Sequence, residues 1–214
     1  MPTSQHHQIS NIIDVIVTLD PRSVLDVGTG FGKYGVLARE YLGGWDGNMR
    51  NNGERRIDGI EGFPGYLSPL HEYVYDNLYR DDIRSILSRL DTHYDLALCI
   101  DVIEHFDSED GCRVLAELQR RASNVLISTP KTFFPQQAEF GNDLEAHRSL
   151  WTPENLIAVA PCCFIPDDFS VICLMGSAAP RIRKRYSFWP NRIGRKLRYL
   201  ASAYRKWGRT EIRA

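Results

Sequence analysis

Three glycines alternate with other residues directly after a short apolar segment, in the order Asp26, Gly28, Gly30 and Gly32. Glycine lets the backbone turn sharply and approach a ligand closely, because it has no Cβ atom to clash. A carboxylate just before such glycines can hold a cationic or hydroxyl-bearing group, whereas it would repel a pyrophosphate. The loop therefore favours a ligand without phosphate charge, and the alternative is a plain tight turn between a strand and a helix.

Further carboxylates follow later strand-like segments. Glu61 is placed to accept two hydrogen bonds from a ribose diol. Asp82 and Ile83 pair an acceptor with an apolar side chain, as an adenine amine and ring face require, and Asp101 ends a buried apolar run. Ligands of open α/β sheets bind outside the carboxyl ends of the strands. We therefore expect these residues to share one site.

The segments that must position these residues alternate between helical and strand-like patterns. Helices are expected at 9–17, 34–42, 83–90, 112–121 and 153–160. Strands are expected at 23–27, 56–61, 74–79, 94–100, 125–128, 162–165 and 169–175. This alternation predicts one α/β domain with a parallel sheet covered on both faces. The last two strands predict a closing hairpin that adds one antiparallel strand at the sheet edge.

In this order the motifs resemble the class I S-adenosylmethionine (SAM)-dependent methyltransferases across roughly residues 20–175. The resemblance is carried by DVGTGFG (26–32), Glu61, Asp82-Ile83 and IDVIEHF (100–106), and WTPENL (151–156) is similar to small-molecule members. The family implies a Rossmann-like sheet of seven strands, mostly parallel, with an antiparallel last strand and helices on both faces. It implies SAM as the cofactor.

The resemblance also implies roles for single residues. Asp26 and the three glycines would lie beside the methionine moiety, and Glu61 would hold the ribose hydroxyls. Asp82 and Ile83 would flank the adenine, and Asp101 would close the pocket.

Two histidines are candidates for the chemistry. Methyl transfer from a sulfonium is an in-line displacement that depends on orientation, and a hydroxyl nucleophile also benefits from a base. His105 follows the fourth strand at the ligand edge. His147 lies in a long polar and aromatic stretch, 130–151, that is expected to cover the acceptor. The alternative for each is a structural role, for His105 at the start of a helix.

The spacing Asp101-x-x-Glu104-His105 is similar to an arrangement in ubiquinone-biosynthesis O-methyltransferases, which in some members is linked to a divalent cation. Such a cation can lower the pKa of a substrate hydroxyl. Asp101 stands where that family usually has Glu, which shortens the reach. A structural use of the three residues is therefore favoured, and no metal ligand is assigned.

The residues after the fourth strand narrow the acceptor class. The [DNS]-P-P-[YFW] loop that commonly serves amino methylation of nucleic-acid bases is not present in IDVIEH, and the double-glutamate loop of arginine methyltransferases is also missing. We therefore expect a hydroxyl oxygen on a small molecule, or on a glycan or lipid-linked intermediate, as the acceptor.

The formal net charge of −1 hides two oppositely charged regions. Residues 1–180 hold 14 of the 26 basic and 26 of the 27 acidic residues, whereas residues 181–214 hold 12 basic residues and one acid. Residues 177–214 are expected to form a basic C-terminal tail. Its apolar side chains fall on one helical face: Ile193, Leu197, Leu200, Tyr204 and Trp207. Such a helix can dock on the acidic body, lie on an anionic membrane surface or, third in preference, bind nucleic acid.

The remaining features place the protein in the cytoplasm, with peripheral membrane association through the tail as an open alternative. The longest apolar runs are far shorter than the ~20 residues of a membrane span, and residues 1–8 do not resemble a signal peptide. Five cysteines without a CxxC pair predict reduced, buried thiols. The sequence thus predicts a methyltransferase domain over residues 1–176. An RNA methyltransferase and a non-catalytic SAM-binding interaction protein remain alternatives, and the oligomeric state is open.

Overall fold

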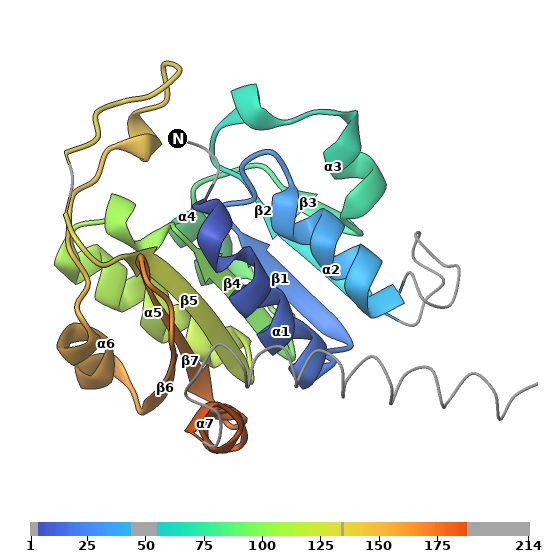
Figure 1. Cartoon of the computed structure of the whole chain (residues 1–214). Helices are drawn as coiled ribbons and strands as arrows, with labels where there is room; N and C mark the ends of the chain where they lie inside the picture. Colours follow the sequence, from blue (N-terminus) through green and yellow to red (C-terminus); the bar gives the residue numbers. More distant parts are fainter. Residues whose placement is uncertain (1–3, 44–54, 134, 188–214) are drawn as a thin grey trace, which may run out of the picture.

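A seven-stranded sheet forms the centre of the molecule (Figure 1). The computed structural model describes residues 4–43, 55–133 and 135–187. The strands are β1 (Ser23–Val27), β2 (Arg56–Ile60), β3 (Asn77–Tyr79), β4 (Leu96–Ile100), β5 (Asn124–Pro130), β6 (Cys162–Ile165) and β7 (Ser170–Gly176). Their order is β3-β2-β1-β4-β5-β7-β6. Strands β1 to β5 pair in parallel, so their carboxyl ends meet at one edge of the sheet.

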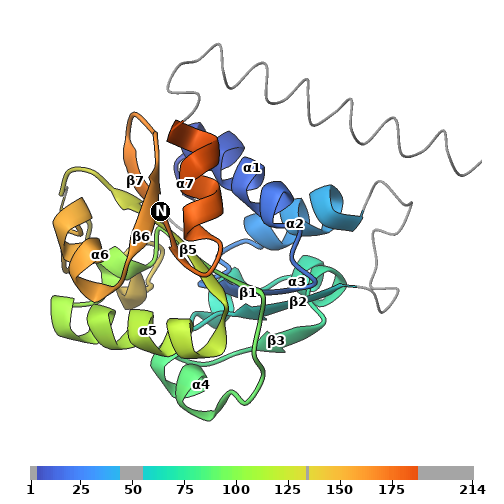
Figure 2. The same cartoon turned by 90° about the horizontal axis from the view of Figure 1, so that it is seen from below.

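Helices cover both faces of this sheet (Figure 2). On one face lie α1 (Ile9–Leu19), α2 (Lys33–Gly43) and α7 (Ala179–Ser187), and on the other lie α4 (Ile83–Arg89), α5 (Ser108–Arg121) and α6 (Pro153–Val159). Side chains alternate between the two faces along each strand. In β1, Val24 therefore joins the apolar cluster beneath α1, whereas Leu25 and Val27 join the cluster beneath α4 and α5. Each face thus has its own core.

The predicted α/β class is confirmed, with a mostly parallel sheet and an antiparallel last strand, β7. The expected place of that strand is wrong. The chain runs first to the edge as β6 and returns as β7, which inserts between β5 and β6 and is antiparallel to both. The edge strand is therefore β6. The antiparallel strand is interior to the sheet.

The strand expected at 74–79 is shorter than predicted. A short helix, α3 (Pro69–Val74), occupies its first residue, and β3 begins only at Asn77. Proline is common at the first position of a helix, and the N–H of Ser68 donates to Nδ1 of His71, 3.2 Å away. These helix-start signals explain the difference. The five cysteines are free as expected, but Cys112 is exposed on α5.

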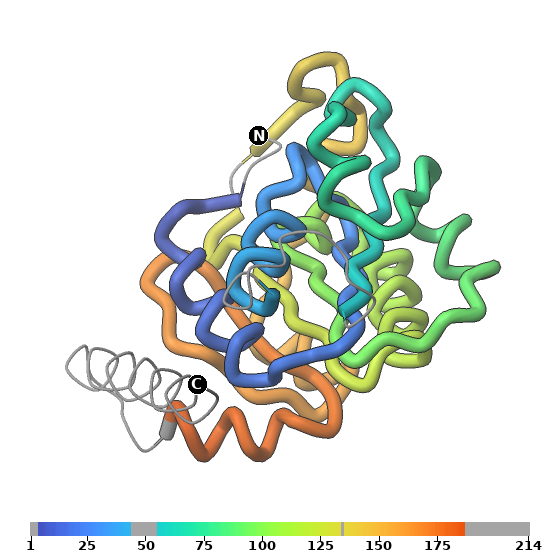
Figure 3. The backbone as a smooth tube through the Cα atoms, turned by 90° about the vertical axis from the view of Figure 1, so that its right-hand side faces the viewer, coloured from blue at the N-terminus to red at the C-terminus, as the bar shows by residue number. Residues whose placement is uncertain are grey.

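The first part of the basic C-terminal region rests on the body of the protein. Helix α7 lies alongside α1 (Figure 3), and Ile182 is fully buried. The hydroxyl of Tyr186 donates to Oδ2 of Asp14 at 2.8 Å, and Arg185 pairs with the other oxygen of Asp14 at 2.7 Å. The apolar face predicted for residues 193–207 lies outside the described residues. Within the described ranges, no helix has the length and apolar character needed to cross a bilayer.

Candidate functional site

The carboxyl ends of the parallel strands surround a pocket. Its cavity volume is about 150 Å³, and the cavity is partly open to solvent. The pocket lies where the strand order reverses between β1 and β4, which is where α/β sheets bind ligands. Six of the eight predicted cofactor residues line it: Gly28, Gly30, Glu61, Asp82, Ile83 and Asp101.

The loop after β1 forms one wall, and its shape requires glycine. Gly28 has a φ of +70°, and a Cβ atom there would lie 2.7 Å from Cγ2 of Val102. The N–H groups of Gly28 and Thr29 both donate to the carbonyl of Ile60, at 2.9 and 3.1 Å. The loop is therefore folded back onto the end of β2. Only a residue without a side chain fits against Val102 in this conformation.

Glu61 follows β2 and holds this loop in place. Its Oε2 accepts hydrogen bonds from the N–H of Gly30 (2.8 Å) and the hydroxyl of Thr29 (3.3 Å), and its Oε1 accepts from the N–H of Phe63 (2.9 Å). Burial raises the pKa of Glu61, and these hydrogen bonds act against that rise. A carboxylate offers about four acceptor positions. The three hydrogen bonds described occupy three of these acceptor positions, so one position remains for a hydroxyl of a ligand.

Asp82 caps the start of α4 and is bound by an arginine that the sequence analysis did not single out. Its Oδ1 accepts from the N–H of Arg84 at 2.8 Å. The guanidinium of Arg84 donates hydrogen bonds to both carboxylate oxygens. Arg84 also pairs with Asp110 at 2.5 Å. The hydrogen bonds from Arg84 hold the pKa of Asp82 below its ordinary value. Arg84 thus belongs to the adenine end of the predicted site.

Asp101 follows β4 in the left-handed region, with a φ of +53°. Its Oδ1 accepts from the hydroxyl of Ser128 at 2.6 Å, and its Oδ2 accepts from Nε2 of Gln8 at 2.6 Å and from the N–H of Gln5 at 3.3 Å. Burial raises the pKa of Asp101 despite these donors. The carboxylate therefore ties the N-terminal segment to the carboxyl edge of the sheet.

Asp26 and Gly32, the other two predicted cofactor residues, lie outside the lining of this pocket. Asp26 alternates with Leu25 and Val27, so it faces the opposite side of the sheet, where the Tyr75 hydroxyl donates to it at 2.6 Å. Burial raises the pKa of Asp26 to about 6, although the hydrogen bond from Tyr75 lowers it. Gly32 lies against the ring of His71. Neither residue therefore faces this pocket.

The two predicted catalytic histidines lie together. His105 ends the short helix η4 (Ile103–His105) directly after β4 and lines the pocket, and His147 belongs to the loop before α6. Their ring centroids are 5.1 Å apart. Nδ1 of His105 lies 3.3 Å from the carbonyl oxygen of Ala146, so it is assigned as the protonated nitrogen. Burial lowers the pKa of His105, which favours the neutral imidazole.

The sequence analysis considered Asp101, Glu104 and His105 as ligands of a cation. The structure does not bring these three side chains together. The carboxylate of Asp101 is engaged by Ser128 and Gln8. His147 instead joins Glu104 and His105, and one potential ligand atom from each residue lies within 4.8 Å of the others.

Solved structures with this architecture are named as methyltransferases or contain SAM or SAH. The N-terminal domain of EvdMO1, in the presence of S-adenosylhomocysteine (SAH) and D-fucose, is similar at a TM-score of 0.57 and 13% identity, over 81% of this chain and 84% of that one. The methyltransferase domain of bacterial CtHen1 is similar at 0.54 and 16%, over 82% and 100%. The chain has the fold of the class I methyltransferases.

A third structure with this fold is magnesium protoporphyrin IX methyltransferase from Synechocystis PCC 6803 with bound SAM. It is similar at a TM-score of 0.52 and 15% identity, over 80% of each chain. No protein-family profile and no curated protein sequence matches the chain. The methyltransferase fold is therefore shown by three-dimensional structure rather than by sequence similarity.

Several residues on the pocket wall of this methyltransferase fold were not singled out from the sequence. The segment expected to cover the acceptor supplies Asn142, Leu144, Glu145 and Arg148, and Figure 1 shows this segment in yellow at the carboxyl edge of the sheet. Its polar and aromatic composition was the only signal for them. Tyr66, from the segment between β2 and α3, also lines the pocket and had no such signal.

Proposed function

We propose that the protein transfers a methyl group from SAM to a hydroxyl oxygen of a small molecule, or of a glycan or lipid-linked acceptor. The observation that carries the proposal is the single pocket that gathers Glu61, Asp82 and Asp101, which follow the parallel strands β2, β3 and β4 of one sheet. SAM presents a sulfonium, an amine and a ribose diol. Carboxylates suit each of these groups, because they attract cations and accept hydrogen bonds.

The charge of the pocket wall supports this cofactor. Six carboxylate residues line it, against two guanidinium groups, those of Arg84 and Arg148. Such a wall disfavours a phosphate-bearing dinucleotide and favours a ligand with net positive charge. Within it, Glu61 is assigned to the ribose hydroxyls through its remaining acceptor position, and Ile83 to the adenine ring. Asp82 shares its carboxylate between Arg84 and the adenine amine.

The acceptor is assigned to the end of the pocket that holds His105. This residue lines the pocket beside Glu145 and Arg148 of the covering segment. A neutral imidazole with Nδ1 donating to Ala146 leaves Nε2 free to accept a proton or to bind a metal ion. Either use acts on a hydroxyl group. The EvdMO1 domain was solved in the presence of D-fucose, which is in keeping with a sugar hydroxyl as the acceptor here.

Calorimetric titration of the full chain with SAH tests the cofactor assignment, and one binding site per chain is expected. The Glu61→Gln variant should bind SAH roughly 10- to 100-fold more weakly, because it weakens a hydrogen bond to a charged acceptor. Glu72→Gln is the matched control, since Glu72 is exposed and pairs only with Arg80 among the interactions described. Wild-type protein that binds neither SAM nor SAH would overturn the proposal.

Radiolabelled SAM tests the acceptor class. The protein is incubated with separated pools of small metabolites, lipids, glycans and nucleic acids, and label is expected in one of the first three. Label that enters nucleic acid alone would contradict the acceptor assignment while leaving the cofactor assignment intact.

A further inference from the structure

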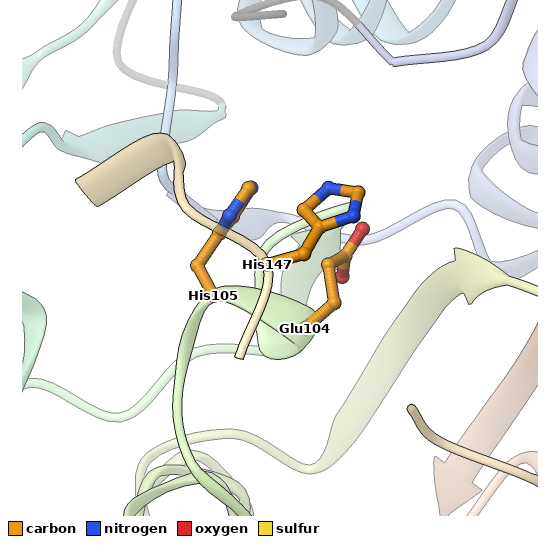
Figure 4. A group of neighbouring side chains, drawn as sticks. All are labelled: Glu104, His105 and His147. Carbon is orange, nitrogen blue, oxygen red and sulfur yellow. The ribbon is translucent and has the colours of Figure 1, made fainter. Parts of the chain in front are cut away.

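One group of side chains beside the pocket has no role in holding the cofactor. Glu104 and His105 come from η4, and His147 comes from the loop before α6. One potential ligand atom from each lies within 4.8 Å of the other two. Figure 4 shows the carboxylate and the two imidazoles extending toward a common space from these two segments.

Backbone hydrogen bonds hold the two segments together. The carbonyl oxygen of Glu104 accepts from the N–H of Arg148 at 2.8 Å and from the N–H of Ser149 at 3.1 Å. The N–H of His147 donates to the carbonyl of Gln136 at 3.1 Å. The approach of His147 to η4 is therefore fixed by the main chain, and side-chain substitutions within the group leave these bonds in place.

The carboxyl group of Glu104 is unusual in this setting. Its residue is 2% exposed, and among the residues that the structure describes Oε2 has no partner with good hydrogen-bond geometry, although the hydroxyl of Thr129 lies nearby. A buried polar atom without a partner costs about 1–3 kcal/mol, and more when it is charged. A bound cation would supply the missing partner and offset the charge.

His105 is presented in the form that a metal ion requires. Metal-binding imidazoles commonly donate their second N–H to a backbone carbonyl, which fixes the ring and leaves the other nitrogen as the ligand. Nδ1 of His105 has such a contact with the carbonyl of Ala146, so Nε2 is available. The ring of His147 lies beside it, with centroids 5.1 Å apart.

We propose that Glu104, His105 and His147 bind one divalent transition-metal ion. Two imidazoles and one carboxylate are the ligands of borderline ions such as Zn²⁺ and Co²⁺, whereas Mg²⁺ and Ca²⁺ prefer all-oxygen sites. Bonds of about 2.1 Å hold ligand atoms roughly 3–4 Å apart. Small side-chain movements therefore bring the three atoms onto one ion. Three protein ligands leave coordination positions open for a further oxygen.

The role of this ion in catalysis rests on the proposed function. His105 both lines the pocket and belongs to the group, so an acceptor hydroxyl bound beside it can enter an open position on the ion. The ion lowers the pKa of that hydroxyl, whose proton passes to water. The oxygen then attacks the methyl carbon of SAM. The new O–C bond forms as the S–C bond breaks, and neutral SAH leaves.

Cobalt binding to the full chain tests the site without any assay of activity. Protein stripped with a chelator is titrated with Co²⁺, followed by visible absorption and calorimetry. We expect one site whose absorption bands show nitrogen and oxygen ligation. Glu104→Gln, His105→Gln and His147→Gln should each weaken binding at least about 10-fold, since even loss of a group supporting a ligand costs that much.

Two control variants distinguish cobalt binding at this site from cobalt binding at other histidines. His6 and His7 are adjacent and exposed, with ring centroids 3.8 Å apart, and offer a second place for cobalt. The variant H6Q/H7Q should keep the high-affinity site. His93→Gln, in which an exposed ring beside Ser123 is replaced, should also keep it. Melting temperature and SAH binding of every variant show that the fold is intact.

The outcomes distinguish this inference from the proposed function. A wild-type chain that takes up neither Co²⁺ nor Zn²⁺, or three variants that bind as tightly as wild type, would overturn the metal site. If SAH binds and cobalt does not, the metal site alone is wrong. If cobalt binds at this site while neither SAM nor SAH binds, the proposed function is wrong and the metal site stands.

Discussion

Nε2 of Gln8 donates a hydrogen bond to Oδ2 of Asp101 at 2.6 Å, joining the start of the chain to the loop after β4. The same carboxylate oxygen accepts from the N–H of Gln5. Nearby, Nζ of Lys33 donates to the carbonyl of Ser4 at 2.9 Å. The segment 4–8 is therefore attached both to the loop after β4 and to the first residue of α2.

We expect Gln8→Ala to loosen this attachment. The change removes a hydrogen bond to a charged acceptor, so the free energy of unfolding should fall by about 1–2 kcal/mol. Amide hydrogen exchange of residues 4–12 should accelerate more than exchange of the sheet. Gln137 is exposed, and Gln137→Ala should change neither quantity. Equal exchange rates in wild type and Gln8→Ala would show that Asp101 does not anchor the segment.

Asp26 makes stability depend on pH in the unusual direction for an acid. Its pKa is raised to about 6, mainly by burial, whereas in the unfolded chain it is about 3.9. Between these values the folded protein binds more protons than the unfolded one, so stability falls as pH rises. Below pH 3.9 the carboxyl is protonated in both states and no penalty applies. Above about pH 6 the full penalty is present.

The Asp26→Asn variant isolates this contribution. An asparagine oxygen can still accept from Tyr75, but it carries no charge to desolvate. Relative to this variant, wild type should lose roughly 2 kcal/mol of stability between pH 4 and pH 7. Denaturant unfolding at several pH values measures the difference. A difference that stays constant over this range would mean that Asp26 titrates normally.

Strand ends were predictable because polar residues closely follow the strand-like segments of the sequence. Glu61, Asp82 and Asp101 were placed at one edge on that basis, and the structure lines one pocket with them. The orientation of Asp26 was not predictable in the same way. It depends on alternation along β1 and on Tyr75, which directly follows α3 and which the sequence analysis placed in a strand.

Contacts between distant segments could not be predicted from local patterns. The sequence analysis offered Asp101 beside Glu104 and His105 because the three are close in sequence. The structure replaces it with His147, since main-chain bonds from Arg148 and Ser149 to Glu104 bring the covering segment onto η4. The engagement of Asp101 by Gln8 likewise depends on how α1 lies on the sheet.

Helix α7 should contribute to the stability of the body through Ile182, which is fully buried. Ile182→Ala removes buried apolar volume, and we expect a loss of about 2–4 kcal/mol in the free energy of unfolding. Ile157 is 56% exposed on α6, so Ile157→Ala should cost under about 0.5 kcal/mol. Denaturant unfolding compares the two. Equal effects would mean that α7 does not dock in solution.

Gly28 should be the least replaceable residue of the pocket wall, for two separable reasons. Its φ of +70° disfavours any side chain, and a Cβ atom would lie 2.7 Å from Val102. Gly141 has a similar φ of +74°, but a Cβ atom there would meet nothing within 4 Å. Gly141→Ala therefore measures the backbone cost alone, about 1–2 kcal/mol.

Gly28→Ala should cost more than Gly141→Ala, by roughly 1–3 kcal/mol, because it adds the clash with Val102. A double-mutant cycle with Val102→Ala should recover that excess while leaving the backbone cost. Unfolding free energies of the four variants measure both parts. SAH affinity should follow the same order, since Gly28 and Val102 both line the pocket. Equal losses for Gly28→Ala and Gly141→Ala would show that Val102 yields without cost, and would remove the steric reason for glycine at this position.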